Sequence, residues 1–190
     1  MISNYYAMLF RMKYINRWSL MHNLRTETLS EHSLETAFIA HCLAVLCNKR
    51  FGGSLNVGDI TAAALFHDTS EVITGDLPTP VKYYNDDIRS AYKDIEAMAE
   101  EKLLDMLPDD LRPEFERLYN LDEKSKKIVK AADKLSALIK CKEELSLGNT
   151  EFSVASKSTE KSIREMHLPE ADAFIEEFLP AFMKGLDENM

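Results

Sequence analysis

The sequence predicts an all-α protein, and three observations lead to that prediction. Apolar side chains recur at helical spacing along almost the whole chain of 190 residues, and no segment reads as a convincing strand. Glycine and proline are sparse, at six each, and they fall where the helical patterns end. A helix start signal, Thr28-Leu-Ser-Glu31, stands directly before an apolar run. We expect the helices to pack into a single domain over residues 1–190.

The expected helices follow one another through short connections. In chain order they cover approximately residues 3–14, 28–51, 56–74, 85–107, 110–119, 122–147, 154–166 and 170–186. An irregular segment, residues 16–25, precedes the second helix. Five apolar side chains mark that second helix as largely buried: Leu34, Phe38, Leu43, Val45 and Leu46.

Glycine and proline define several helix ends. Gly75 is expected to cap the third helix, because glycine tolerates the left-handed backbone conformation found at such ends. Pro78 and Pro80 are expected to prevent immediate re-entry into a helix. Gly148 is expected to end the helix at 122–147, and Pro180 to kink or split the last one.

Composition and charge restrict the class of protein. No apolar run approaches the roughly 20 residues of a membrane helix, and no basic stretch precedes an apolar one at the N-terminus, so we expect neither a membrane span nor a signal peptide. Three cysteines, an odd number, favour a reducing compartment, and we expect a cytoplasmic protein. The net charge of -9 disfavours a nucleic-acid polymer as partner, but not a small anion held by local cations.

Titratable residues interrupt apolar helices at three places. His67 and Asp68 follow an apolar run, and Glu71 comes one turn later, so all three are expected on or near one face of the third helix. His32 lies beside the capping box of the second helix. Asp133 interrupts the apolar stripe of the helix at 122–147. Burying such groups is costly unless something compensates, and a divalent cation does so.

The set His32, His67, Asp68 and Asp133 offers two imidazole nitrogens and two carboxylate oxygens, with no thiolate. Such donors suit Mn, Co, Fe or Zn, and they fit a catalytic metal with open positions better than a structural zinc site.

Other histidines have a simpler interpretation. His22, His41 and His167 are interpreted as ordinary core or surface residues. Nine residues separate His41 from His32, about 900° of helix, so His41 is expected to project from the opposite side. Taken alone, Asp133 is also compatible with a solvated position on a helix.

The order His32, then His67-Asp68, then Asp133 resembles the HD-domain metal-dependent phosphohydrolases. Longer strings are similar to the bacterial 5′-deoxynucleotidases of that superfamily: Ile15-Asn-Arg-Trp-Ser-Leu-Met21, Arg25-Thr-Glu-Thr-Leu-Ser-Glu-His-Ser33 and His67-Asp-Thr-Ser-Glu-Val-Ile-Thr-Gly-Asp-Leu-Pro-Thr-Pro-Val-Lys82. The similarity spans nearly the whole chain, and its most specific part is the string that ends at Lys82. It implies an HD-domain helical bundle.

That resemblance implies an activity and a cofactor. His32, His67, Asp68 and Asp133 would hold one divalent metal ion, with Co²⁺ or Mn²⁺ favoured over Zn²⁺ or Fe²⁺. The implied enzyme is a 5′-deoxynucleotidase, which hydrolyses a deoxyribonucleoside 5′-monophosphate to the nucleoside and phosphate with little action on ribonucleotides. The resemblance and the apolar helical surface also favour a homodimer.

The phosphate and the attacking water have their own expected partners. Glu71, outside the ligand set, is placed to orient the water or to shuttle a proton. Arg17 suits a bidentate contact with phosphate. By the resemblance, Trp18 also contacts substrate, on the sugar or the base. Taken alone, this pair is more often a surface arginine beside a core tryptophan.

The sugar is expected to be recognised in the loop after the third helix. Asp76 is placed to accept a hydrogen bond from the 3′-hydroxyl group. The tight turn of Leu77, Pro78 and Thr79 would leave no room for a 2′-hydroxyl group, and this would distinguish deoxyribose from ribose. Lys82 would add positive potential.

Other function classes stay open at this stage. One is an HD-domain phosphohydrolase acting on a nucleoside triphosphate or an alarmone, although few lysines and arginines near the motifs favour a monophosphate. Another is an HD-fold oxygenase, which needs two metals and further histidines. A third is a non-catalytic nucleotide-binding regulator, against which Glu71 argues.

Overall fold

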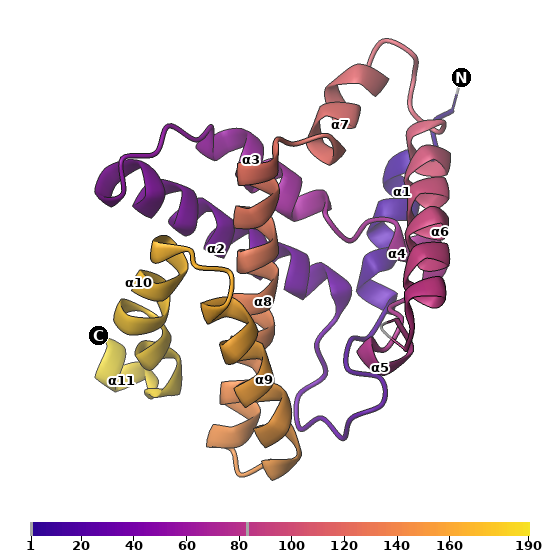
Figure 1. The fold of residues 1–190 in the computed structure, drawn as a ribbon. Helices are drawn as coiled ribbons and strands as arrows, with labels where there is room; N and C mark the ends of the chain where they lie inside the picture. Colours follow the sequence, from indigo (N-terminus) through magenta and orange to yellow (C-terminus); the bar gives the residue numbers. More distant parts are fainter. Residues whose placement is uncertain (1, 83) are drawn as a thin grey trace.

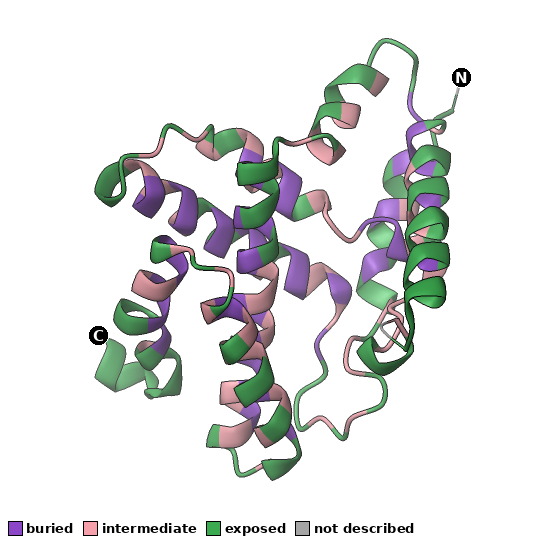
Figure 2. Cartoon of the chain, in the orientation of Figure 1, coloured by how far each residue is buried: buried purple, intermediate pink, exposed green. Residues whose placement is uncertain are grey.

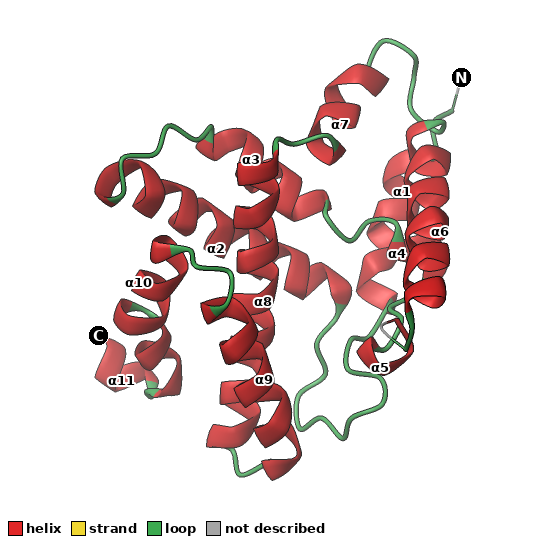
Figure 3. Cartoon of the chain, in the orientation of Figure 1, coloured by secondary structure: helices red, strands yellow, loops and turns green. Residues whose placement is uncertain are grey.

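The computed structural model describes residues 2–82 and 84–190, and these form helices without a strand (Figure 3). This confirms the all-α prediction. The α-helices are α1 (Tyr5–Leu9), α2 (Leu29–Arg50), α3 (Val57–Phe66), α4 (Glu71–Thr74), α5 (Thr79–Lys82), α6 (Asp86–Leu104), α7 (Arg112–Tyr119), α8 (Glu123–Ser146), α9 (Ser153–Arg164), α10 (Pro169–Glu177) and α11 (Leu186–Asn189). Short 3₁₀ helices, η1 (Phe10–Tyr14), η2 (Thr150–Phe152) and η3 (Leu179–Met183), lie between them.

The two long helices α2 and α8 form the centre of the molecule, and α3 packs against both (Figure 1). Figure 2 shows buried positions gathered where these helices face one another. Leu43, Ile60, Ile128 and Leu135 are at most 1% exposed in this core. Fully burying a side chain of this kind stabilises the fold by about 1.5–3 kcal/mol relative to leaving it exposed.

A second, smaller core joins the N-terminal helix to α6 and α7. Tyr5, Leu103, Leu104 and Leu107 are buried there, and the ring of Phe115 meets that of Tyr5 edge-on at a centroid distance of 5.1 Å. α6 also packs against α4 and α5. This core therefore supports the chain segment that follows the end of α3.

Several helix ends lie where the sequence predicts them. Thr28 and Glu31 form the expected capping box at the start of α2. Asp122 caps α8, and Gly148, with a φ of 90°, follows its end. Pro180 lies in the 3₁₀ helix that separates α10 from α11, which confirms a split at this residue.

The third helix is interrupted, contrary to the prediction of one helix over residues 56–74. α3 ends at Phe66, residues 67–70 form turns, and α4 begins at Glu71. Side chains occupy the carbonyl groups that would continue the helix: the Thr69 hydroxyl donates to Phe66 O at 2.8 Å, and His67 Nδ1 lies 2.7 Å from Ala64 O. His67 and Glu71 therefore do not lie on one continuous helical face.

Other expectations about single residues were wrong. Pro80 does not prevent a helix, because it lies in the first turn of α5, where a missing amide proton costs little. The first helix is α-helical only to Leu9 and continues as η1. On α2, Leu34 and Phe38 are 49% and 66% exposed, because the opposite face of this helix packs against α3 and α8.

The structure also bears on the expected membrane spans and on the state of the cysteines. No helix among the described residues is long and apolar enough to cross a membrane. Cys42, Cys47 and Cys141 are free thiols, as expected from their odd number.

Candidate active site

His32 enters the site from the first turn of α2, and its ring is fully buried. Its Nδ1 lies 3.1 Å from the hydroxyl oxygen of Ser136 on α8. Its Nε2 points the other way, 3.2 Å from Asp133 Oδ1 and 3.7 Å from Asp68 Oδ2. In metal-binding histidines, a hydrogen bond at one ring nitrogen orients the other ring nitrogen toward the metal ion.

His67 and Asp68 occupy the turn that follows α3. Because a carbonyl oxygen only accepts hydrogen bonds, the Nδ1 of His67 donates to Ala64 O and carries its proton there. This leaves Nε2 facing Asp68 Oδ2 at 3.1 Å, without the geometry of a hydrogen bond. The turn therefore presents one nitrogen and one oxygen side by side.

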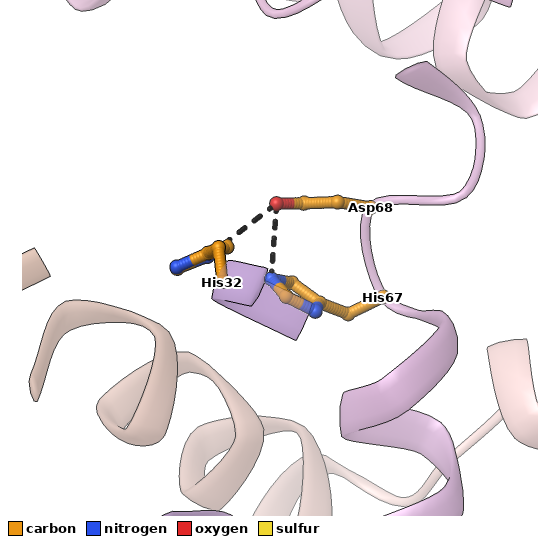
Figure 4. Close-up of side chains that lie close together, drawn as sticks. All are labelled: His32, His67 and Asp68. Carbon is orange, nitrogen blue, oxygen red and sulfur yellow. Dashed lines mark ion pairs between the residues drawn. The ribbon is translucent and has the colours of Figure 1, made fainter. Parts of the chain in front are cut away.

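Ligand atoms of His32, His67 and Asp68 converge to within 4.8 Å of one another. Figure 4 shows the three side chains pointing together from α2 and from the turn after α3. Asp133, on α8, approaches through His32 Nε2 and lies outside this group of three. The donor set fits a divalent cation, because a buried imidazole nitrogen of His67 has no hydrogen-bond partner among the described residues and faces a carboxylate.

Charges in the cluster strongly affect its protonation. Burial lowers the pKa of His67, but the charges of Asp68 and Asp133 outweigh this effect and raise it to about 9. Burial raises the pKa of Asp68, yet the charges of His67, His32 and Arg17 hold it well below its usual range. A proton on His67 offsets part of the negative charge of Asp68 and Asp133. A dication bound at the cluster would replace that proton.

Glu71 lies at the start of α4 and is 6% exposed. Its Oε2 is buried without a hydrogen-bond partner among the described residues. Burial, followed by the charges of Asp68 and Asp76, raises its pKa to about 9, although Arg17 opposes the shift. The carboxyl group is therefore free to exchange a proton with a bound molecule.

Arg17 and Trp18 reach the site from the irregular segment before α2. The Arg17 guanidinium lies 3.4 Å from Asp68 Oδ2 and 3.4 Å from Glu27 Oε2. The indole nitrogen of Trp18 donates to the same Glu27 oxygen at 2.7 Å. The Trp18 ring packs against Phe152 at a centroid distance of 5.3 Å.

The residues after α4 lie near the cluster but are not bonded to it. Asp76 is half-buried, and burial raises its pKa while Arg17 lowers it. Pro78 O accepts the amide proton of Val81 at 2.8 Å. In the described chain, no hydrogen bond or ion pair joins the side chains of Leu77 or Thr79 to the cluster.

A pocket of about 260 Å³ opens beside the cluster, between α3, α6, α7 and α8. His67 and Asp133 are part of its lining, and Lys126, Lys130 and Glu100 supply charges. The pocket gives small molecules access to the candidate ligands from the α8 side.

Histidines outside the predicted site lie at the surface. His22, His41 and His167 are all exposed, as expected, and His41 lies on the far side of α2 from His32. The sequence reasoning missed Glu27 and Ser136. Ser136 lies one turn after Asp133 on the same helix, and this spacing is the signal by which it was recognisable.

Sequence comparison decides the family. The sequence model described as 5′-deoxynucleotidase YfbR-like matches residues 4–182. The chain belongs to the YfbR-like 5′-deoxynucleotidase family. A 5′-deoxynucleotidase of Klebsiella pneumoniae is 50% identical over 189 residues, which covers 98% of this chain and 95% of the relative. A 5′-deoxynucleotidase of Vibrio cholerae is also 50% identical over 189 residues, covering 98% and 97%.

Solved structures share the fold of this YfbR-like protein. An HD-domain phosphohydrolase from Listeria innocua superposes with a TM-score of 0.81 at 24% identity, covering 97% of this chain and 92% of that one. The HD phosphohydrolase of cyanophage S-2L, bound to dA and one catalytic Zn²⁺ ion, gives a TM-score of 0.67 at 16% identity, with coverages of 92% and 95%. These similarities confirm the HD-domain helical fold.

Proposed function

We propose that this protein is a metal-dependent 5′-deoxynucleotidase, which hydrolyses deoxyribonucleoside 5′-monophosphates to deoxyribonucleosides and phosphate. The observation that carries the proposal is the convergence of His32, His67 and Asp68 in a chain of the YfbR-like family. The relatives from K. pneumoniae and V. cholerae bear the name 5′-deoxynucleotidase and match this chain over nearly its whole length.

His32, His67, Asp68 and Asp133 would hold one divalent cation. Their nitrogen and oxygen donors suit Co²⁺ or Mn²⁺, and Zn²⁺ and Fe²⁺ accept the same set. When bound, the cation polarises a phosphoryl oxygen and lowers the pKa of a bound water molecule. Asp133 would complete the set, since its Oδ1 lies 3.2 Å from His32 Nε2.

Arg17 and Glu71 would act directly on the reacting groups. The Arg17 guanidinium lies beside Asp68 and offers several N–H donors, so it binds and orients the phosphate and stabilises its charge during the reaction. The Glu71 carboxyl group, with one oxygen unpartnered, holds the attacking water or moves its proton.

Trp18 and the residues after α4 would recognise the sugar. The Trp18 indole packs on the sugar or base, and Asp76 accepts a hydrogen bond from the 3′-hydroxyl group. Leu77, Pro78 and Thr79 form the wall that excludes a 2′-hydroxyl group. Support comes from the half-buried position of Asp76 and from the charge interaction that links it to Arg17.

We further propose that residues 1–190 act as one HD domain and assemble as a homodimer in the cytoplasm, with no nucleic-acid polymer or membrane as partner. Ile88, Ile95 and Met98 support a self-association surface, because they recur at helical spacing on α6 and are 37–50% exposed. Light scattering of the purified protein tests the dimer.

The decisive experiment measures phosphate release from a panel of nucleotides. Metal-stripped protein is reloaded in turn with Co²⁺, Mn²⁺, Zn²⁺ and Fe²⁺, and assayed with deoxyribonucleoside and ribonucleoside mono-, di- and triphosphates. We expect rapid release from the deoxyribonucleoside monophosphates alone. Faster hydrolysis of triphosphates would contradict the assignment, and equal rates on both sugars would contradict the role of Asp76.

Substitution of Glu71 tests the role of its carboxyl group. We expect Glu71→Ala and the similarly shaped Glu71→Gln to lower kcat by about 10²–10⁴-fold, because positioned proton transfer contributes that much. Metal content after equilibrium dialysis should stay unchanged, since Glu71 lies outside the ligand set. Near-normal turnover in both variants would remove Glu71 from the reaction.

A further inference from the structure

The carboxylate of Glu27 is buried next to the candidate substrate contacts, and the side chain is 7% exposed. Its Oε2 accepts a hydrogen bond from Trp18 Nε1 at 2.7 Å and lies 3.4 Å from Arg17 Nε. Its Oε1 lies 3.9 Å from His32 Nδ1, too far for a hydrogen bond, and Ser136 is the closer partner of that nitrogen. Glu27 therefore acts mainly on Arg17 and Trp18.

A buried carboxylate is costly unless charge and hydrogen bonds compensate it. Here the compensation comes from the two neighbouring residues that are proposed to meet the phosphate and the sugar. One carboxylate oxygen contacts both side chains, so the position of each is tied to that of the other. The main chain adds a third link, because Arg17 N donates to Glu27 O at 2.9 Å.

The backbone at Trp18 shows why such support is required. Trp18 has a φ of 58°, in the left-handed region that a bulky residue rarely adopts. Strained residues of this kind persist only where their surroundings hold them in place. The indole nitrogen is held by Glu27, and the indole ring packs against the tilted ring of Phe152. The Trp18 carbonyl oxygen accepts from the Asn23 side chain at 3.2 Å.

We propose that Glu27 is a positioning residue, which holds Arg17 and Trp18 as one unit against the phosphate and the sugar. This proposal rests on the proposed function for the identity of the substrate. The physical claim, that the Glu27 carboxylate fixes the Trp18 indole and the Arg17 guanidinium, is independent of the proposed function. Glu27 binds neither cation nor substrate, and its effect on the reaction passes through its two partners.

Two substitutions separate the links that Glu27 makes. Glu27→Gln keeps an oxygen that accepts from the indole but removes the charge that pairs with Arg17. Glu27→Ala removes both links. Glu35→Ala is the matched control, because Glu35 lines the same small cleft beside α2, and among the described residues no hydrogen bond or ion pair joins it to Arg17 or Trp18.

Fluorescence reports on the first link without any substrate or metal. Trp18 is the single tryptophan of the chain, so the emission spectrum and its quenching by acrylamide describe that indole alone. We expect Glu27→Ala to shift emission to longer wavelength and to increase quenching, and Glu27→Gln and Glu35→Ala to resemble the unsubstituted protein. An unchanged spectrum in a folded Glu27→Ala variant would overturn the proposal.

Kinetics with a deoxyribonucleoside monophosphate report on the second link. We expect kcat/KM to fall about 10–100-fold in Glu27→Ala, the usual effect of losing a residue that orients a binding group. Glu27→Gln should show a raised KM for the nucleotide with selectivity for deoxyribose retained, whereas Glu27→Ala should lose selectivity. Unchanged KM and selectivity in both variants would also overturn the proposal.

The outcomes distinguish this inference from the proposed function. If the unsubstituted protein fails to hydrolyse deoxyribonucleotides, the proposed function is wrong, while fluorescence still decides whether Glu27 holds Trp18. If Glu27→Ala does not fold, as judged by helical circular dichroism, Glu27→Gln carries the kinetic test. A Glu27→Gln variant with normal KM would then contradict the role of the charge.

Discussion

Two segments outside the long helices lie beside candidate metal ligands in the sequence, and they are held in very different ways. Residues 15–28 precede α2 and carry Arg17 and Trp18. Residues 75–82 follow α4 and carry Asp76. Both are proposed to touch the substrate: the first at the phosphate through Arg17 and at the sugar or base through Trp18, the second at the sugar through Asp76. The difference in their support indicates how the site combines rigidity with adjustment.

The 15–28 segment is anchored to the distant end of α8. Glu144, 1% exposed, accepts from the amides of Leu24 and Arg25 at 3.0 and 3.1 Å and from the side chain of Asn149 at 2.8 Å. Lys140, one turn earlier, donates to Glu144 and to the Arg25 carbonyl oxygen. The segment is therefore fixed before any substrate arrives.

Among residues 2–82 and 84–190, fewer hydrogen bonds and ion pairs join the 75–82 segment to the rest of the molecule. The Gly75 amide donates to Glu71 O at 2.8 Å, and Lys82 pairs with Glu96 on α6 at 2.7 Å. Between these ends, no hydrogen bond or ion pair to the Asp76 side chain occurs within the described residues. Few such bonds are typical of segments that open or adjust locally. The comparison indicates that the 15–28 segment is preorganised and that the 75–82 segment is adjustable.

The largest expected effect comes from breaking the anchor. Glu144→Ala leaves the buried Lys140 ammonium without its carboxylate partner and two backbone amides without their acceptor, so the free energy of unfolding should fall by about 3–5 kcal/mol. Urea unfolding followed by circular dichroism measures it. Glu143→Ala, on the next residue of the same helix, is the control and should change stability by less than about 1 kcal/mol. Equal losses of unfolding free energy in Glu144→Ala and Glu143→Ala would show that the bonds to Glu144 add no specific stability.

Acid should weaken the same anchor. Although burial raises the pKa of Glu144, hydrogen bonds from Lys140 and Asn149 lower it from 4.5 to about 2. The folded-state pKa is depressed, so this group contributes its stability at pH above about 4.5 and loses it as pH falls toward 2. The difference in unfolding free energy between the unsubstituted protein and Glu144→Gln should shrink over that interval. A difference in unfolding free energy that stays constant with pH would contradict the role of the ionised Glu144 carboxylate.

Asp76→Ala, unlike Glu144→Ala, should have a small effect on stability and a large effect on activity. No hydrogen bond within the described structure depends on this side chain, so the change in unfolding free energy should stay under about 1 kcal/mol. Loss of a charged acceptor for the 3′-hydroxyl group should lower kcat/KM by about 10–100-fold. Asp87→Ala, exposed on α6, is the control. A strong loss of stability would show that the 75–82 segment is not lightly held.

The smallest effect concerns the backbone at Gly75. A Cβ there would meet no atom within 4 Å, but φ is +73°, so Gly75→Ala should cost about 1–2 kcal/mol of stability through backbone strain alone. Gly58, in the first turn of α3, has no such φ and has ordinary space around it. Gly58→Ala should therefore stabilise by about 0.5–1 kcal/mol. Thermal melts that show the same sign for both would contradict this interpretation.

The sequence predicted the helices and the cluster better than it predicted the connections. Apolar periodicity and capping residues are local signals, and they placed α2, α6 and α8 to within a few residues. His32, His67 and Asp68 were recognisable because polar groups on apolar helices need compensation. The break after Phe66 was not predictable from spacing, since it depends on side chains of His67 and Thr69 taking carbonyl groups from the backbone.

Long-range partners explain the rest of what the sequence reasoning missed. Glu27 reads as one more acidic residue before a capping box until Arg17 and Trp18 are seen around its carboxylate. Glu144 likewise looks like a solvated helical carboxylate until the Leu24 and Arg25 amides are found on it. The first pairing depends on the path of an irregular segment, and the second joins residues about 120 positions apart, so neither follows from a helical spacing.

The distance along the chain between the 15–28 segment and its anchor has a consequence for biosynthesis. The ribosome makes this segment early, whereas Lys140, Glu144 and Asn149 emerge only after α2, α3 and α6 have been made. Until then its amides and the Arg25 carbonyl group remain bonded to water. The part of the site that is most firmly held in the finished protein is thus among the last to become ordered as the chain is synthesised.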